Sequence, residues 1–164
     1  MCKIIVIGCP GCGKSTFSRE LHKIINIPLF HLDMMYWNTD KTTVGKNVFC
    51  EKLSEVLKKD KWIIDGNYAS TMELRIAACD TVIFLDYPLE ICLSGIRERH
   101  GKTHSDIPWV SNSEDEAELI AFAESYHLQQ RPQVMRLLNK YSEKKIIIFA
   151  NRSEADAFLS DIKQ

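Results

Sequence analysis

The most informative part of the chain is a glycine-rich stretch near its start, Gly8-Cys9-Pro10-Gly11-Cys12-Gly13-Lys14-Ser15. It matches the pattern G-x-x-x-x-G-K-[ST] at every fixed position. Glycines let the backbone curl until successive N–H groups point at a common anion. The pattern therefore predicts a phosphate-binding loop, in which Lys14 reaches the terminal phosphates and the Ser15 hydroxyl ligates Mg²⁺. We expect Thr16, the next residue, to belong to the same site.

The segments on either side have the structure that such a loop requires. Residues 3–7 predict a buried parallel strand, because Lys3 is followed by four apolar, β-branched residues. Residues 14–25 carry Phe17, Leu21 and Ile24 at helical spacing. A helix that begins at the loop adds the positive end of its dipole to the phosphate site. We therefore expect the chain to bind ATP together with Mg²⁺.

The rest of the chain alternates between strand and helix patterns. Further strands are expected at 28–32, 62–64, 81–85 and 145–149, and helices at 46–59, 70–79, 88–100, 114–141 and 153–162. Residues 34–45 read as irregular, and Pro132 is expected to break the long helix. This alternation predicts an α/β P-loop NTPase fold with a five-stranded parallel sheet and helices on both faces. We expect residues 1–164 to form a single domain with a small helical lid at about 97–131.

Composition excludes several kinds of protein. The formal net charge is −1, whereas general nucleic-acid binders usually carry a strong basic excess, so direct nucleic-acid contact is not expected. No apolar run approaches the ~18 residues of a membrane span. The six cysteines lack the density of a secreted disulfide scaffold. We expect a cytoplasmic protein, either monomer or homodimer, with free thiols. The Cys9-x-x-Cys12 spacing also occurs in redox motifs, and that role stays open.

Among P-loop proteins, the sequence favours a small-molecule kinase. A GTPase usually carries N-K-x-D, but residues 139–142 read Asn-Lys-Tyr-Ser and lack the aspartate. Transporter ATPases, helicases and AAA machines are longer than 164 residues. Phosphoryl transfer depends on positioning and charge neutralisation, so a kinase needs arginines, a lysine, Mg²⁺ and a small acceptor.

Carboxylates follow three of the expected strands, where ligands bind in such sheets. Asp33 could take the proton of an acceptor hydroxyl or hold magnesium through water. Asp65, followed by Gly66, could orient magnesium-bound water or line the acceptor pocket, and Asp86 resembles a magnesium ligand. The sequence does not decide which of the three serves the metal, and each could instead form a turn.

Arginines supply the positive charge that a lid needs. Arg97, Arg99 and Arg131 could close over the triphosphate and stabilise the transition state, or could form a solvated helix face. Arg75 could meet an acceptor phosphate from the opposite side.

Aromatic residues could complete the acceptor pocket. Trp37 and Tyr68, together with Tyr36, could stack a planar acceptor such as a nucleobase, or could simply belong to the core.

A family resemblance extends from the P-loop over most of the chain. The residues that carry it are His31-Leu32-Asp33, Tyr36-Trp37, Trp62-Ile63-Ile64-Asp65-Gly66-Asn67-Tyr68, Arg75, and residues 78–88, ACDTVIFLDYP. These segments resemble the adenylate-kinase-related proteins often named DNA topology modulation proteins. The resemblance implies a nucleoside/nucleotide-kinase type of fold that binds ATP, and it implies no particular acceptor.

The chain departs from this family in its lid, and it departs from true adenylate kinases after Asp65-Gly66. Gly95 and His104 stand where basic lid residues are expected. Asn67-Tyr68 follows Asp65-Gly66, where adenylate kinases place an arginine, so adenylate is a doubtful acceptor. Three hypotheses stay open: a nucleoside or nucleotide kinase, a metabolite kinase of the shikimate or gluconate kind, and a regulatory ATPase without a small acceptor.

Overall fold

The fold was obtained as a computed structural model, which describes residues 1–104 and 106–163. The elements in chain order are β1 (Lys3–Gly8), α1 (Lys14–Ile25), β2 (Leu29–His31), α2 (Leu32–Tyr36), α3 (Lys46–Leu57), β3 (Trp62–Asp65), α4 (Ala69–Ala78), β4 (Thr81–Leu85), α5 (Leu89–Glu98), α6 (Ser113–Lys140), β5 (Lys145–Phe149) and α7 (Arg152–Lys163). None of the helices in the described part is long and apolar enough to cross a membrane.

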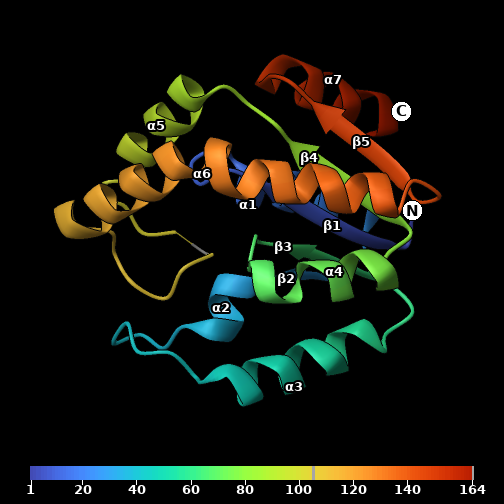
Figure 1. Cartoon of the computed structure of the whole chain (residues 1–164), viewed down its shortest axis with the longest axis horizontal. Helices are drawn as coiled ribbons and strands as arrows, with labels where there is room; N and C mark the ends of the chain where they lie inside the picture. Colours follow the sequence, from blue (N-terminus) through green and yellow to red (C-terminus); the bar gives the residue numbers. More distant parts are fainter. Residues whose placement is uncertain (105, 164) are drawn as a thin grey trace.

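Among the described residues, five strands form one parallel sheet, as the sequence predicted, and their order is β2-β3-β1-β4-β5. The chain first moves outward from β1 to β2 and then returns across the sheet to β4 and β5 (Figure 1). The point where the order reverses lies beside β1, and ligands bind there in open α/β sheets. Thus the glycine-rich loop that follows β1 lies at the expected place.

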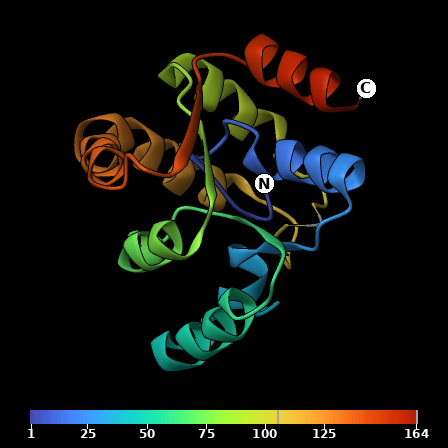
Figure 2. The same ribbon diagram turned by 90° about the vertical axis from the view of Figure 1, so that its right-hand side faces the viewer.

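The central strands β1, β3 and β4 are buried on both sides because their alternate side chains face two separate helical layers. Ile4 and Val6 pack in a cluster with residues of α1, α5 and α7. Ile5 and Ile7 pack in the other, with residues of α2, α3 and α4. Figure 2 shows α7 and α3 on opposite sides of the sheet. Burial on both faces explains why the strands read as continuous apolar runs.

Helix α6 corrects the expectation of a break at Pro132. It runs unbroken from Ser113 to Lys140. Proline removes one backbone hydrogen bond, but the buried side chains on either side of it, Tyr126 and Val134, anchor both halves of the helix in the core. Tertiary packing therefore holds the helix together across the proline.

The segment after β2 is more regular than expected. Residues 32–36 form the short helix α2, and the remainder folds back so that Trp37 pairs with Thr43 in an isolated antiparallel bridge. Leu32 is fully buried and fixes the start of α2 on the sheet. A short helix with one buried apolar residue has too little periodicity to be recognised from sequence.

Candidate active site

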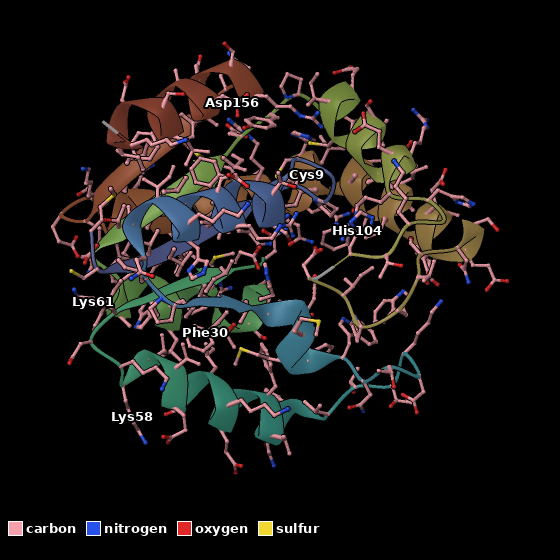
Figure 3. All side chains as sticks on the ribbon, turned by 180° about the vertical axis from the view of Figure 1, so that it is seen from behind. Cys9, Phe30, Lys58, Lys61, His104 and Asp156 are labelled. Atoms are coloured by element: carbon pink, nitrogen blue, oxygen red, sulfur yellow. The ribbon has the colours of Figure 1, made fainter. Side chains whose placement is uncertain are left out.

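A cavity of about 850 Å³ lies beside the loops that follow β1 and β3. Its walls include residues 10–16, Asp33, Trp37, residues 66–69, and residues from the predicted lid. Figure 3 labels two lining residues, His104 between α5 and α6 and Asp156 on α7, together with Cys9 in the glycine-rich loop. The size is within the ~300–1,000 Å³ typical of small-molecule sites.

The P-loop (residues 8–15) has the conformation that its glycines permit. Gly8, Gly11 and Gly13 all have positive φ angles, and Gly13 leads directly into α1. The Lys14 ammonium donates to the carbonyl oxygens of Gly8 at 2.9 Å and Cys9 at 3.0 Å, so the charge lies over the loop. A curled backbone, a lysine and a helix N-terminus converge here, which suits a polyphosphate.

Gly95 has a structural role that the sequence did not reveal. A Cβ atom on Gly95 would lie 2.0 Å from the carbonyl oxygen of Gly11, and one on Gly11 would lie 2.0 Å from the carbonyl oxygen of Cys92. The P-loop therefore packs backbone to backbone against α5. The missing basic residue at position 95 reflects this close approach, since no larger side chain fits.

Asp33 and Tyr68 form a hydrogen-bonded pair on the cavity wall. The Tyr68 hydroxyl donates to Asp33 Oδ1 at 2.6 Å. Burial raises the pKa of Asp33 above its ordinary value, although the bond from Tyr68 and the charge of Lys14 oppose this rise. A carboxylate with a raised pKa is better suited to accept a proton from a substrate hydroxyl.

Residues 66–68 connect the P-loop to α2, because Asn67 bonds to Gly8 whereas Gly66 and Tyr68 contact residues of α2. Asn67 Nδ2 donates to the Gly8 carbonyl at 2.7 Å, and the Gly8 N–H donates to Asn67 Oδ1 at 3.2 Å. Gly66 has φ +128° and lies so close to Leu32 that a Cβ would contact it at 2.9 Å. Asn67 was missed in the sequence, although it lies inside the Asp-Gly-Asn-Tyr segment that carried the resemblance.

His31 and Asp65 support the same segment from the neighbouring strand. His31 Nδ1 donates to Asp65 Oδ1 at 2.8 Å between the paired ends of β2 and β3. Burial opposes the protonated ring, but the hydrogen bond and charge of Asp65 dominate and raise the pKa of His31. Asp65 is only 4% exposed and is absent from the cavity walls that the described residues form. We therefore revise its expected role from substrate contact to support.

The structure corrects the expected role of Arg75. Its side chain is completely buried. The guanidinium donates to the carbonyl oxygens of Gly66 at 2.9 Å and Tyr68 at 3.2 Å, and also to that of Asn67. Burial lowers its pKa to about 10, which leaves the charge in place at neutral pH. Arg75 therefore holds the loop after β3 and does not reach an acceptor.

Asp106 is a buried lid carboxylate that sequence reasoning missed. It accepts hydrogen bonds from Ser15 Oγ at 2.7 Å and from Arg99 Nη2 at 2.8 Å, and Arg19 Nη1 lies 3.8 Å away. Burial alone would raise its pKa, but Arg99 and the Ser15 hydroxyl hold the pKa below the usual value. An ionised carboxylate thus lies beside the predicted magnesium ligand. Arg99 lines the cavity, and its role over the triphosphate stays a prediction.

Asp86 and Arg131 bind each other, in contrast to their expected separate roles. Arg131 Nε and Nη2 donate to the two carboxylate oxygens of Asp86 at 2.8 and 2.7 Å. In the part of the chain that the structure describes, neither residue lines the cavity, and Arg97 is exposed at the end of α5. The bidentate pair ties α6 to the end of β4, so this geometry favours a structural role for both residues.

The aromatic residues form a cluster of edge-on contacts. Tyr36 packs against Trp37 with ring centroids 5.1 Å apart and against Tyr68 at 5.0 Å. Trp37 also meets Trp109 of the predicted lid at 5.6 Å. Trp37 and Tyr68 line the cavity, so their stacking role stays a prediction. The contact of Trp37 with Trp109 joins the predicted lid to the acceptor side, which the sequence did not suggest.

Comparisons with known proteins place this fold among kinases. No family model matches the chain. A shikimate kinase from Clostridium botulinum (strain Eklund 17B / Type B) is 27% identical over 108 residues, which cover 57% of this chain and 66% of the relative, slightly less than two thirds of its length.

Two solved structures show the same architecture. The shikimate kinase from Bacteroides thetaiotaomicron has a TM-score of 0.55 at 18% identity, and the match covers 98% of this chain and 95% of that chain. The shikimate kinase from Aquifex aeolicus vf5 has a TM-score of 0.53 at 18% identity, with 97% and 92% covered. The chain therefore has the P-loop fold of these kinases. The resemblance to DNA topology modulation proteins stays a prediction.

Proposed function

We propose that the protein is a kinase that transfers the γ-phosphoryl group of Mg·ATP to a hydroxyl group of a small acceptor. The observation that carries the proposal is a single cavity walled by both the P-loop and the Asp33–Tyr68 pair. In-line phosphoryl transfer needs a phosphate cradle facing a group that orients the attacking hydroxyl. The similarity to shikimate kinases supports the same reaction class.

The residues present fit ATP and magnesium. The P-loop offers a curled backbone and Lys14 for the phosphates, and Ser15 has an ionised carboxylate, Asp106, at 2.7 Å. Hydroxyl and carboxylate oxygens are the ligands that Mg²⁺ prefers. We propose that Ser15 and Asp106 hold the ion. When bound, magnesium would neutralise the charge of the transferred group.

The chain's own residues would perform the other tasks. Asp33 would accept the proton of the acceptor hydroxyl, and Tyr68 would hold the Asp33 carboxylate in place. Lys14 and Arg99 would stabilise the charge that spreads over the phosphoryl oxygens. Asn67 would fix the position of the P-loop relative to Asp33. It binds Gly8, and the next residue, Tyr68, binds Asp33.

The cavity wall around Asp33 favours an uncharged, hydroxylated acceptor. Among the described lining residues, those of α2 and the start of α4 are acidic, aromatic or neutral, and the basic ones come from the P-loop, α1, the predicted lid and α7. Arg75, the candidate for an acceptor phosphate or carboxylate, is fully buried. Trp37 and Tyr68 offer aromatic surface, so a nucleoside fits this wall better than a nucleotide does.

A metabolite kinase of the shikimate kind is the second candidate. The 27% identity to a shikimate kinase favours it. An acceptor of this kind carries a carboxylate, which needs a cationic partner. Lys102 and Arg99 of the predicted lid line the cavity and could supply one.

The test is release of ADP from Mg·ATP across a panel of nucleosides, nucleotides, shikimate and gluconate. We expect one acceptor to stimulate release, and Asp33→Asn to lower the stimulated rate about 10²–10⁴-fold without loss of ATP binding. Asp40→Asn, at an exposed aspartate, is the matched control. A flat panel with intact ATP binding would contradict the proposal and favour a regulatory ATPase.

A further inference from the structure

Two cysteines and a histidine converge outside the cavity, behind the P-loop. Ligand atoms of Cys9, Cys92 and His127 all lie within 4.8 Å of one another. They come from three elements: the P-loop, α5 and α6. Both cysteines are free and buried, and neither they nor His127 lines the cavity that the described residues form. We call these three residues the Cys₂His cluster.

The two thiols of the Cys₂His cluster interact with each other, and their contacts with the surrounding backbone are long. His127 Nε2 is buried and has no hydrogen-bond partner among the described residues. Cys9 Sγ reaches the Ala123 carbonyl only at 3.9 Å, and Cys92 Sγ reaches that of Tyr87 only at 3.8 Å. Buried polar atoms normally find partners, so an unpartnered ring nitrogen in a histidine that lies beside two thiols leaves room for a ligand.

The kind of ligand follows from the donor set. Thiolates and imidazole select zinc and similar thiophilic ions, whereas magnesium requires oxygen ligands. Zn–S and Zn–N bonds of about 2.3 and 2.1 Å place tetrahedral ligand atoms roughly 3.6–3.8 Å apart. The ligand atoms of the three residues lie within 4.8 Å of one another, so small side-chain rotations would bring them to the spacing of zinc ligands. Binding would release the two thiol protons to solvent.

We propose that Cys9, Cys92 and His127 bind one zinc ion behind the P-loop. This ion is distinct from the Mg²⁺ that we propose at Ser15. It would join the first variable position of the P-loop to α5 and α6, adding to the close packing of Gly11 on Gly95. The inference is independent of the proposed kinase activity, because it rests on a different set of atoms.

The test is titration of the reduced, metal-free protein with Co²⁺, which reports thiolate ligation by a charge-transfer absorption band. We expect one Co²⁺ per chain, displaced by Zn²⁺. Changes to residues that merely support metal ligands cost 10–100-fold in affinity, so we expect Cys92→Ser and His127→Gln to weaken binding at least 100-fold. Cys79→Ser, which removes another buried free thiol on the opposite face of the sheet, should bind as wild type does.

A stability measurement keeps the test valid if Cys92→Ser folds poorly. Zinc at a free concentration of about 100 times its dissociation constant should raise the Tm of wild type by about 5–10 °C, and should not raise that of His127→Gln. His127 is only half-buried, so this variant should fold. No charge-transfer band in wild type, or an equal band and Tm rise in His127→Gln, would overturn the proposal.

Discussion

Replacing Gly95 by alanine tests how the P-loop is held. The new Cβ would lie 2.0 Å from the Gly11 carbonyl oxygen, about 1 Å closer than real Cβ contacts come. Both partners are backbone, so either α5 or the P-loop must move. Overpacking of this kind costs ~2–3 kcal/mol. The better helix propensity of alanine returns ~1 kcal/mol. The net loss of ~1–2 kcal/mol corresponds to a fall in Tm of ~2–8 °C.

The effect on activity should exceed the effect on stability. A displacement of about 1 Å in a catalytic group can lower turnover roughly 100-fold. We would measure Tm and Mg·ATP turnover for Gly95→Ala beside Ser94→Ala, an exposed neighbour on the same helix. The Ser94→Ala control should keep the Tm and the turnover of wild type. If Gly95→Ala were more stable than wild type and equally active, the contact with Gly11 would not constrain the P-loop.

Three further changes test individual residues. Lys14→Ala should weaken ATP binding at least 100-fold, since it removes a charge-assisted phosphate contact in the P-loop. Calorimetric titration checks this, and retained affinity would refute the site. Tyr68→Phe removes a hydrogen bond that lowers the pKa of Asp33, so the acid limb of kcat/KM should move to higher pH, and an unchanged limb would exclude Asp33 as the base. The raised pKa of His31 means that its pairing with Asp65 stabilises the fold fully below about pH 6.5 and less as pH rises through the folded-state pKa. The free energy of unfolding, followed by urea denaturation, should therefore depend less on pH in His31→Gln, and an equal dependence would argue against this pair.

The sequence predicted the sheet and the P-loop because local patterns determine both. Residues 4–7 form an unbroken apolar run, and the Gly13-Lys14-Ser15 triplet opens a helix with clear apolar spacing. These signals do not depend on distant parts of the chain. The order of the strands was not predicted, because the rules for parallel strands with crossover helices leave several topologies open.

The partners of the charged residues could not be predicted, because they come from distant parts of the chain. Asp106 meets Ser15 across 91 positions, and Arg131 meets Asp86 across 45. Nothing in the local sequence distinguishes an arginine that faces phosphate from one that faces a carboxylate. Arg75 is an example. The sequence placed it correctly on a helix, but its guanidinium binds the backbone of residues 66–68 and not an acceptor phosphate.

The most direct test of the account is mass spectrometry of the acceptor after incubation with Mg·ATP and the protein. We predict that one hydroxylated acceptor gains a single phosphoryl group, and that Asp33→Asn forms that product at least 100-fold more slowly. ADP formation without any phosphorylated acceptor, equal in wild type and Asp33→Asn, would contradict the claim that this cavity transfers phosphoryl groups to a small molecule.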